Sequence, residues 1–182
     1  MSELDELRAR AASGAPFELV LFWGHTPKSA GAVDKACLSQ WYPAPFDVDG
    51  RRYPTAEHCM MAAKARLFGD EETRARVLAA PDPATAKKLG REVRGFDNER
   101  WTAARVGIVR AASHAKFAQN EALGAFLRAT GDAVLAEASA TDPIWGIGLA
   151  ESDARAQDPC TWIGLNLLGF ALMDARARLR VG

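Results

Sequence analysis

Glu57, in the segment Pro54-Thr55-Ala56-Glu57-His58, is the residue of this sequence best placed to do chemistry. The hydroxyl of Thr55 can cap the free amides of a helix, and residues 56–67 are all compatible with helix. Glu57 then lies in the first turn, where the helix dipole favours negative charge by roughly 0.3–1 kcal/mol. We therefore expect Glu57 to stay ionised and to stabilise positive charge or activate water rather than act as a general acid.

Lys64 shares a stripe of the same predicted helix with Glu57, because Glu57, Met61, Lys64 and Phe68 follow a four-three-four spacing. A stripe that mixes a carboxylate, an ammonium group and apolar side chains favours a face directed toward a pocket. A simpler interpretation stays open, in which Glu57 only complements the dipole and Lys64 is a surface side chain with its stem on apolar neighbours.

A second candidate segment is Asp142-Pro143-Ile144-Trp145-Gly146-Ile147-Gly148. The indole of Trp145 can stack on a base or a sugar, and Gly146 lets the backbone approach a ligand closely. The glycine pattern differs from the dinucleotide-binding and Walker A patterns. The alternative is a packed turn, with Trp145 in the core and Asp142 starting an Asp-Pro turn.

Trp101 and Asn166 are weaker candidates. Helical spacing places Trp101, Arg105 and Lys116 on one stripe of a predicted helix. Such a stripe is more typical of the side of a helix that faces the core than of a wall that binds a ligand. Asn166 is most simply a helix cap, although its amide could also hydrogen-bond a ribose. No His, Cys or carboxylate group has a recognised metal-ligand spacing, so we predict no metal site.

The elements that must position these residues are mostly helical. Hydrophobic spacing and Gly, Pro, Asp or Asn boundaries predict helices near residues 3–12, 56–67, 70–80, 83–89, 98–117, 120–130 and 165–179. Strands are expected at residues 19–23 and 133–138, and a hairpin at residues 46–53, where Asp49-Gly50 suits a type I′ turn. Residues 25–35 are expected to form a surface loop.

The composition indicates a single domain without bulk affinity for polyanions. The chain has 182 residues, 48% of them hydrophobic, and its 23 basic and 23 acidic residues cancel. No net field would therefore attract nucleic acid or a membrane. The chain has an odd number of cysteines, Cys37, Cys59 and Cys160, which are widely spaced and form no C-x-x-C motif. This pattern is typical of a protein in a reducing compartment. With no signal peptide or membrane-length apolar run visible, we expect a cytoplasmic protein with no membrane partner.

In their order along the chain, the motifs resemble the NADAR (YbiA-like) family over residues 20–179. They are Leu38-Ser39-Gln40-Trp41-Tyr42-Pro43, Asp49-Gly50, Pro54-Thr55-Ala56-Glu57-His58, Ala63-Lys64, Leu89-Gly90-Arg91, Ala115-Lys116-Phe117, Trp145-Gly146-Ile147-Gly148 and Gly164-Leu165-Asn166-Leu167-Leu168-Gly169. Two departures stand out, since many members have Asn-Phe at Gln40-Trp41 and some have Asp at Ile147. Asp142 could replace that missing carboxylate, or it could only organise the turn.

The resemblance implies a compact α+β domain over residues 19–180, mostly helical with a small β-sheet, after an N-terminal helical extension over residues 1–18. It also implies hydrolysis of N-glycosidic bonds in riboflavin-pathway ribose-phosphate intermediates or in ADP-ribose conjugates, including ADP-ribosylated guanine in nucleic acid. No cofactor is expected. Family motifs carry the catalytic role to Glu57, with Asp142 second, and suggest as substrate-binding residues Lys64, Trp101, Trp145, Gly146 and Asn166.

Two other functions are compatible with the same residues. One is a non-catalytic module that binds ADP-ribose or NAD-derived metabolites in the same pocket. The other is a helical protein-interaction domain, for which nucleotides should not raise the thermal stability.

Overall fold

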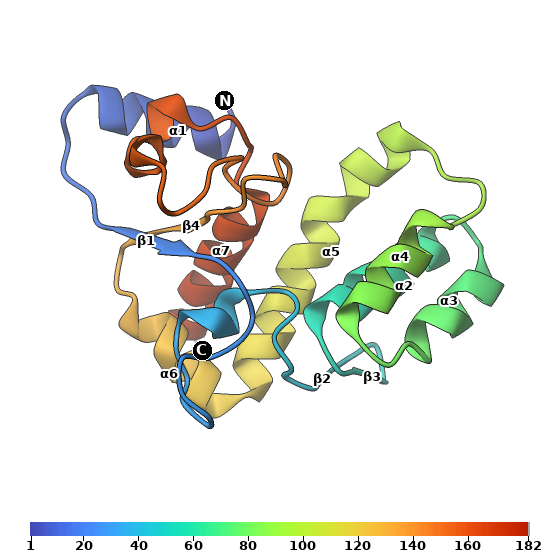
Figure 1. Cartoon of the computed structure of the whole chain (residues 1–182). Helices are drawn as coiled ribbons and strands as arrows, with labels where there is room; N and C mark the ends of the chain where they lie inside the picture. Colours follow the sequence, from blue (N-terminus) through green and yellow to red (C-terminus); the bar gives the residue numbers. More distant parts are fainter. Residues whose placement is uncertain (182) are drawn as a thin grey trace.

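A computed structural model, which describes residues 1–181, shows two groups of elements on either side of one long helix, α5 (Asn98–Gln119) (Figure 1). One group is a layer of helices: α2 (Ala56–Leu67), α3 (Glu71–Leu78) and α4 (Pro83–Arg91). The other contains both chain ends and a small sheet: α1 (Glu3–Ala12), β1 (Leu19–Phe22), α6 (Glu121–Ala129), β4 (Val134–Glu137) and α7 (Leu167–Val181). This arrangement confirms the predicted α+β class with mostly helical content.

The strands form two separate two-stranded sheets. β1 pairs with β4 in parallel, with Leu19 opposite Val134 and Phe22 opposite Glu137. β2 (Phe46–Val48) and β3 (Arg51–Tyr53) form the predicted hairpin. Asp49 and Gly50 have φ angles of 52° and 71°, so both adopt the left-handed conformation that a type I′ turn requires.

The predicted helices are confirmed, with ends that differ by a few residues. Thr55 caps α2 as expected, since its hydroxyl accepts the amide of His58 at 3.3 Å. The loop after β1 contains a 3-10 turn, η1 (Lys35–Leu38), and the loop-rich segment before α7 contains two more, η2 (Ala154–Gln157) and η3 (Pro159–Thr161). No helix among residues 1–181 is both long and apolar enough to cross a membrane.

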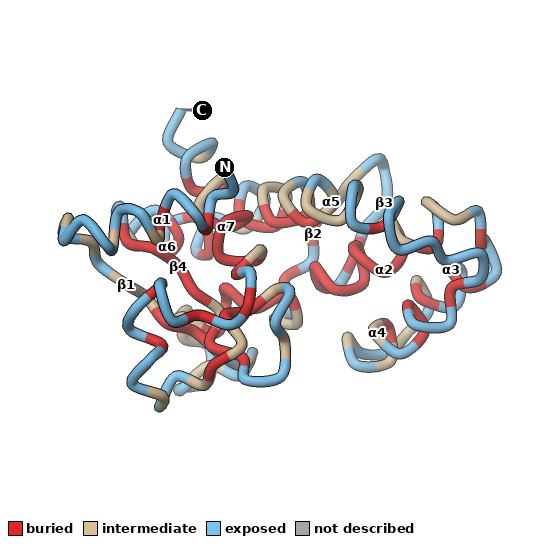
Figure 2. Tube along the Cα trace, turned by 90° about the horizontal axis from the view of Figure 1, so that it is seen from above, coloured by how far each residue is buried: buried red, intermediate tan, exposed pale blue. Residues whose placement is uncertain are grey.

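Buried side chains lie on both faces of the parallel strand pair. Phe22 and Leu135 join the main core, which α2, α5 and α7 surround. Leu21 and Ala136 face the other way, into a smaller cluster that Leu4 and other side chains complete. In Figure 2 the buried trace accordingly runs from the α1 side of the molecule, through α7 and α5, to α2. Both strands are therefore fixed from two sides, which fixes the loops at their carboxyl ends.

Candidate active site

Glu57 is a buried carboxyl at the start of α2, with only 2% of its surface exposed. Its backbone amide donates to the carbonyl of Gln40 at 3.0 Å, which ties α2 to the segment after η1. One carboxyl oxygen, Oε1, is buried without a hydrogen-bond partner among residues 1–181. Burying a carboxyl oxygen without a hydrogen-bond partner lowers the stability of the folded protein. Such an oxygen is expected where a ligand supplies the missing partner.

Burial raises the pKa of Glu57 to about 7, although the nearby Lys87 and the side chain of Trp41 oppose that rise. The charge of Asp142 raises the pKa further. The helix dipole therefore does not hold the pKa of Glu57 low, although Lys87 still favours the ionised form. The dipole stabilises the charge by less than the carboxyl loses in hydration, so the net effect of the site is to raise the pKa of Glu57.

Glu137, the last residue of β4, is a second carboxyl of this site. Burial raises the pKa of Glu137 to about 7, and the charge of Asp142 raises it further while Lys87 lowers it. Glu57 also raises the pKa of Glu137. The charge of Glu57 therefore acts on Glu137, but less than burial, Asp142 and Lys87 do.

Asp142 lies beside both glutamates in a turn that its own side chain organises. Its Oδ1 accepts the backbone amides of Ile144 at 3.0 Å and Trp145 at 2.9 Å. Gly146 follows in close contact with the end of β4, because an added Cβ would come within 2.7 Å of the Glu137 carbonyl oxygen. The turn that sequence suggested for Asp142 is present, and it brings Asp142 to the two glutamates.

Two cations lie next to these carboxyls. Lys87 of α4 lowers the pKa of Glu57 and of Glu137, and its Nζ is 5.8 Å from the centre of the Trp41 ring. Arg91, one turn further along α4, also lowers the pKa of Glu57. Among residues 1–181, no ion pair includes Lys87 or Arg91. The site thus combines acidic groups with cations that are available to a phosphate.

Lys64 and Trp101 lie together. The Lys64 ammonium donates to the carbonyl of Gly90 at 2.7 Å and lies 5.6 Å from the centre of the Trp101 ring. Burial lowers the pKa of Lys64, and Arg91 lowers it further. Trp101 itself packs in the main core. Contact of Trp101 or of Lys64 with a substrate stays a prediction.

Asn166 has a structural position that sequence did not predict. It is fully buried and has a left-handed φ of 53°. Its Nδ2 donates to the carbonyl of Leu135 at 2.9 Å, and its Oδ1 accepts the amide of Glu137 at 3.2 Å. Both polar atoms are thus bonded to β4, so Asn166 positions Glu137 and has no exposed surface with which to bind a ribose.

A cavity of about 370 Å³ adjoins the carboxyl ends of β1 and β4. Its lining includes the exposed Trp23, which follows β1, together with Ala138 and Thr141, which lie between Glu137 and Asp142 in the chain. Ligands of parallel sheets commonly bind outside the carboxyl ends of the strands. Within residues 1–181, no three His, Cys, Asp or Glu side chains are grouped so that they could hold a metal ion.

Sequence reasoning missed Glu137, Lys87 and the role of Trp41. Glu137 is the one acidic residue in an apolar strand, and that contrast was the available signal. Lys87 and Lys88 are adjacent on a helix, so only the orientation of α4 on α2 decides which of them faces Glu57. Trp41 belonged to a recognised motif, but its contact with Glu57 depends on the path of the η1 segment.

A model of the NADAR domain family matches residues 21–180 of this chain. The chain belongs to the NADAR family. N-glycosidase R617 of Acanthamoeba polyphaga mimivirus is 38% identical over 162 residues, which cover 86% of this chain and 94% of that protein. N-glycosidase YbiA of Escherichia coli K12 is 33% identical over 148 residues, covering 81% of this chain and 84% of YbiA. The predicted family is confirmed.

The fold agrees with that of one of these relatives. The NMR structure of Escherichia coli YbiA superimposes with a TM-score of 0.70 at 28% identity, covering 91% of this chain and 88% of YbiA. A further relative, riboflavin biosynthesis protein VVA0006 of Vibrio vulnificus, is 36% identical over 143 residues, which cover 79% of this chain but 35% of that longer protein. This NADAR chain therefore resembles two relatives named N-glycosidases and one named for riboflavin biosynthesis.

Proposed function

We propose that this NADAR protein hydrolyses the C–N bond between ribose and base in a ribose-phosphate compound, with Glu57 and Glu137 as its acid–base pair. An N-glycosyl hydrolase is the enzyme class that its relatives support. The observation that carries the residue assignment is the buried Glu57 carboxyl, with one oxygen unpaired, beside Glu137 and Asp142.

The chemistry needs two carboxyls in opposite protonation states. As the C–N bond breaks, a carboxylic acid gives its proton to the departing base, and positive charge develops on the ribose. An ionised carboxylate stabilises that charge and takes a proton from the water whose oxygen bonds to the sugar carbon. Two glutamates whose pKa values are both raised to about 7 suit this division of roles, because near neutral pH each can take the protonated or the ionised form.

The surroundings of the two glutamates favour one assignment of these roles. After burial, the strongest influence on the pKa of Glu57 is the cation Lys87, which favours the ionised form. For Glu137 it is the anion Asp142, which favours the protonated form. We assign Glu57 as the carboxylate and Glu137 as the acid. Asp142 then acts by its charge, and Lys87 with Arg91 supplies the phosphate contact.

The proposed substrates are of two kinds: aminopyrimidine ribose phosphates, which the name of the Vibrio relative suggests, and ADP-ribose conjugates such as ADP-ribosylated guanine in DNA. Both carry a ribosyl C–N bond and a phosphate. Trp145 and the exposed Trp23 are the rings that could stack on the base. A cytoplasmic location stays a prediction from sequence.

The decisive experiment measures release of free base from both substrates by the wild type and by Glu57→Gln, which keeps the size of the side chain and removes its charge. We expect Glu57→Gln to lose about 10²–10⁴-fold in turnover while it still binds substrate. Glu18→Gln, at an exposed position, is the matched control.

Two outcomes would contradict this proposal. Equal turnover by the wild type and Glu57→Gln would remove Glu57 from the mechanism. Binding of ADP-ribose that raises the melting temperature, without turnover of either substrate, would favour the non-catalytic binding module instead.

A further inference from the structure

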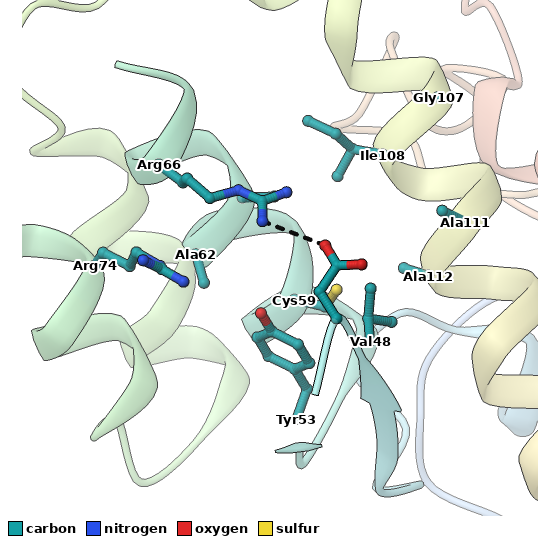
Figure 3. Close-up of a pocket in the computed structure, with 12 residues that line it drawn as sticks. Val48, Tyr53, Cys59, Ala62, Arg66, Arg74, Gly107, Ile108, Ala111 and Ala112 are labelled. Carbon is teal, nitrogen blue, oxygen red and sulfur yellow. Dashed lines mark hydrogen bonds and ion pairs between the residues drawn. The ribbon is translucent and has the colours of Figure 1, made fainter. Parts of the chain in front are cut away.

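A second cavity, of about 270 Å³, opens on the side of α2 that faces away from Glu57 (Figure 3). Cys59, Ala62 and Arg66 line it from α2. At 3.6 residues per turn, these residues lie roughly 140–200° around the helix from Glu57. The cavity is therefore separate from the carboxyl site, although both share one helix.

The cavity exists because the residues that face it across the gap between α2 and α5 are small. They are Ala62 and Ala63 on α2, and Gly107, Ala111 and Ala112 on α5. A Cβ added at Gly107 would meet nothing within 4 Å. Small residues alone do not make a site, but here they leave apolar walls on α2 and α5 around an accessible space.

The floor of the cavity holds a polar group without a partner. Tyr53, on β3, is 7% exposed, and no hydrogen bond joins its hydroxyl to any other of residues 1–181. Figure 3 shows the ring rising from the hairpin with its hydroxyl directed into the space beside α2. The ring is buried while its hydroxyl opens into the cavity, where it can donate a hydrogen bond to a ligand.

Two guanidinium groups stand beside this hydroxyl. Arg66 pairs with Asp49 at 3.3 Å, and Arg74 pairs with Glu71 at 2.8 Å. Each guanidinium has five N–H donors, so neither is saturated by one carboxylate. Burial raises the pKa of Tyr53, while Arg74 and Arg66 act against that rise, in accord with their position around the ring.

We propose that this cavity binds a small organic oxyanion, a phosphate monoester or a carboxylate on a compact apolar body, independently of the carboxyl site. The oxyanion would accept from the Tyr53 hydroxyl and from Arg74 and Arg66, which suit its geometry. The apolar body would lie between the small residues of α2 and α5. The volume is just below the usual range of ligand pockets, so the body is limited to about one ring. Asp49 competes for Arg66, so the affinity is modest.

The test uses phenyl phosphate, benzoate and inorganic phosphate as probes, with dissociation constants from NMR titration at fixed ionic strength. Tyr53→Phe should weaken binding of the two organic anions about tenfold, because one charge-assisted hydrogen bond is lost. Gly107→Leu should abolish it by filling the cavity, and Leu favours helix where Gly does not.

Asp49→Asn gives the most specific test, because it should strengthen binding of the two organic anions severalfold. Asn tolerates the left-handed φ of 52° at this position, so the hairpin is kept, while Arg66 loses its competing carboxylate. A gain of affinity cannot come from misfolding. The preferred probe, phenyl phosphate or benzoate, identifies the type of oxyanion.

Lys87→Met separates this inference from the proposed function, since it removes the phosphate contact proposed for the carboxyl site and should bind the probes in the second cavity as the wild type does. Loss of probe binding in Lys87→Met would place the anion in the carboxyl site and overturn the inference. Unchanged affinity in Tyr53→Phe and Gly107→Leu would also overturn it, as would absence of binding at millimolar concentration. Inorganic phosphate that binds as tightly as phenyl phosphate would rule out a role for the apolar walls.

Discussion

Lys87 acts on both buried glutamates, because its charge lowers the pKa of Glu57 and of Glu137. Lys87→Met should therefore raise both apparent pKa values, by up to about one unit. The ionised carboxylate would then form only at higher pH, and the acid would keep its proton to higher pH. We expect both limbs of the profile of kcat/KM against pH to move in the alkaline direction.

The adjacent lysine is the control for this shift. Lys88 is exposed and is not among the charges that act on either glutamate, so Lys88→Met should leave the profile in place. The assignment fails if Lys87→Met and Lys88→Met give the same profile as the wild type.

At the scale of single residues, the sequence predicts where a candidate side chain lies in a helix or loop better than it predicts the protonation state of that side chain. Glu57 could be placed, because Thr55 marks the start of its helix. Its raised pKa could not be predicted, since it depends on burial beneath the Gln40-Trp41 segment and on Asp142, which is distant in the chain. The role of Asn166 could not be predicted either, because it depends on hydrogen bonds to β4, which is distant from Asn166 in the chain.

Packing of α4 on α2 decides how Lys87 meets Glu57, and Gly90 makes this packing close. A Cβ at Gly90 would collide with the side chain of Met61, whose Cγ would be 2.9 Å away. Gly90→Ala should lower the free energy of unfolding by about 1–3 kcal/mol, since the side chain of Met61 must leave its position or the helices must separate. Chemical denaturation measures this, and base release should fall with it because Lys87 moves with α4.

Gly107→Ala on α5 is the matched substitution, as its Cβ would meet nothing. It should stabilise the protein by about 0.5–1 kcal/mol through helix propensity. If both glycine variants change stability in the same direction, contact with Met61 is not the cause.

Helices could be predicted because their signals are local. The side chains of Thr55, Asp82 and Asp97 each accept an amide three residues on, and each marks the start of a helix. The pairing of β1 with β4 could not be predicted. The two four-residue strands are far apart in the chain, and neither carries a local signal that identifies its partner strand or its register. Tertiary packing decides both.

Three buried groups make the stability of the whole molecule depend on pH near neutrality. The pKa values of Glu57 and Glu137 are raised from 4.5 to about 7, so their stabilising contribution is complete below pH 4.5 and is lost as pH rises through about 7. Burial lowers the pKa of Lys116 from 10.5 to about 7, so its contribution is present above pH 10.5 and is lost as pH falls through about 7.

Glu57→Gln should therefore be more stable than the wild type at pH 8, by up to about 3 kcal/mol, and nearly equal to it at pH 4.5. Urea unfolding at the two pH values measures the difference. Glu18→Gln, a substitution at an exposed position, should have the same free energy of unfolding as the wild type at both pH values. A Glu57→Gln variant that is less stable at pH 8 would show that the buried carboxyl is ionised and paired.

The parallel pairing of β1 with β4 also sets the order in which this protein can form during synthesis. Residues 19–22 leave the ribosome long before residues 134–137, so β1 must wait without its partner strand. Leu21 and Phe22, which the folded protein buries, lack the strand that pairs with theirs for that period. Because Glu137 ends β4, a chain interrupted before that strand lacks both the partner of β1 and one of the two buried glutamates.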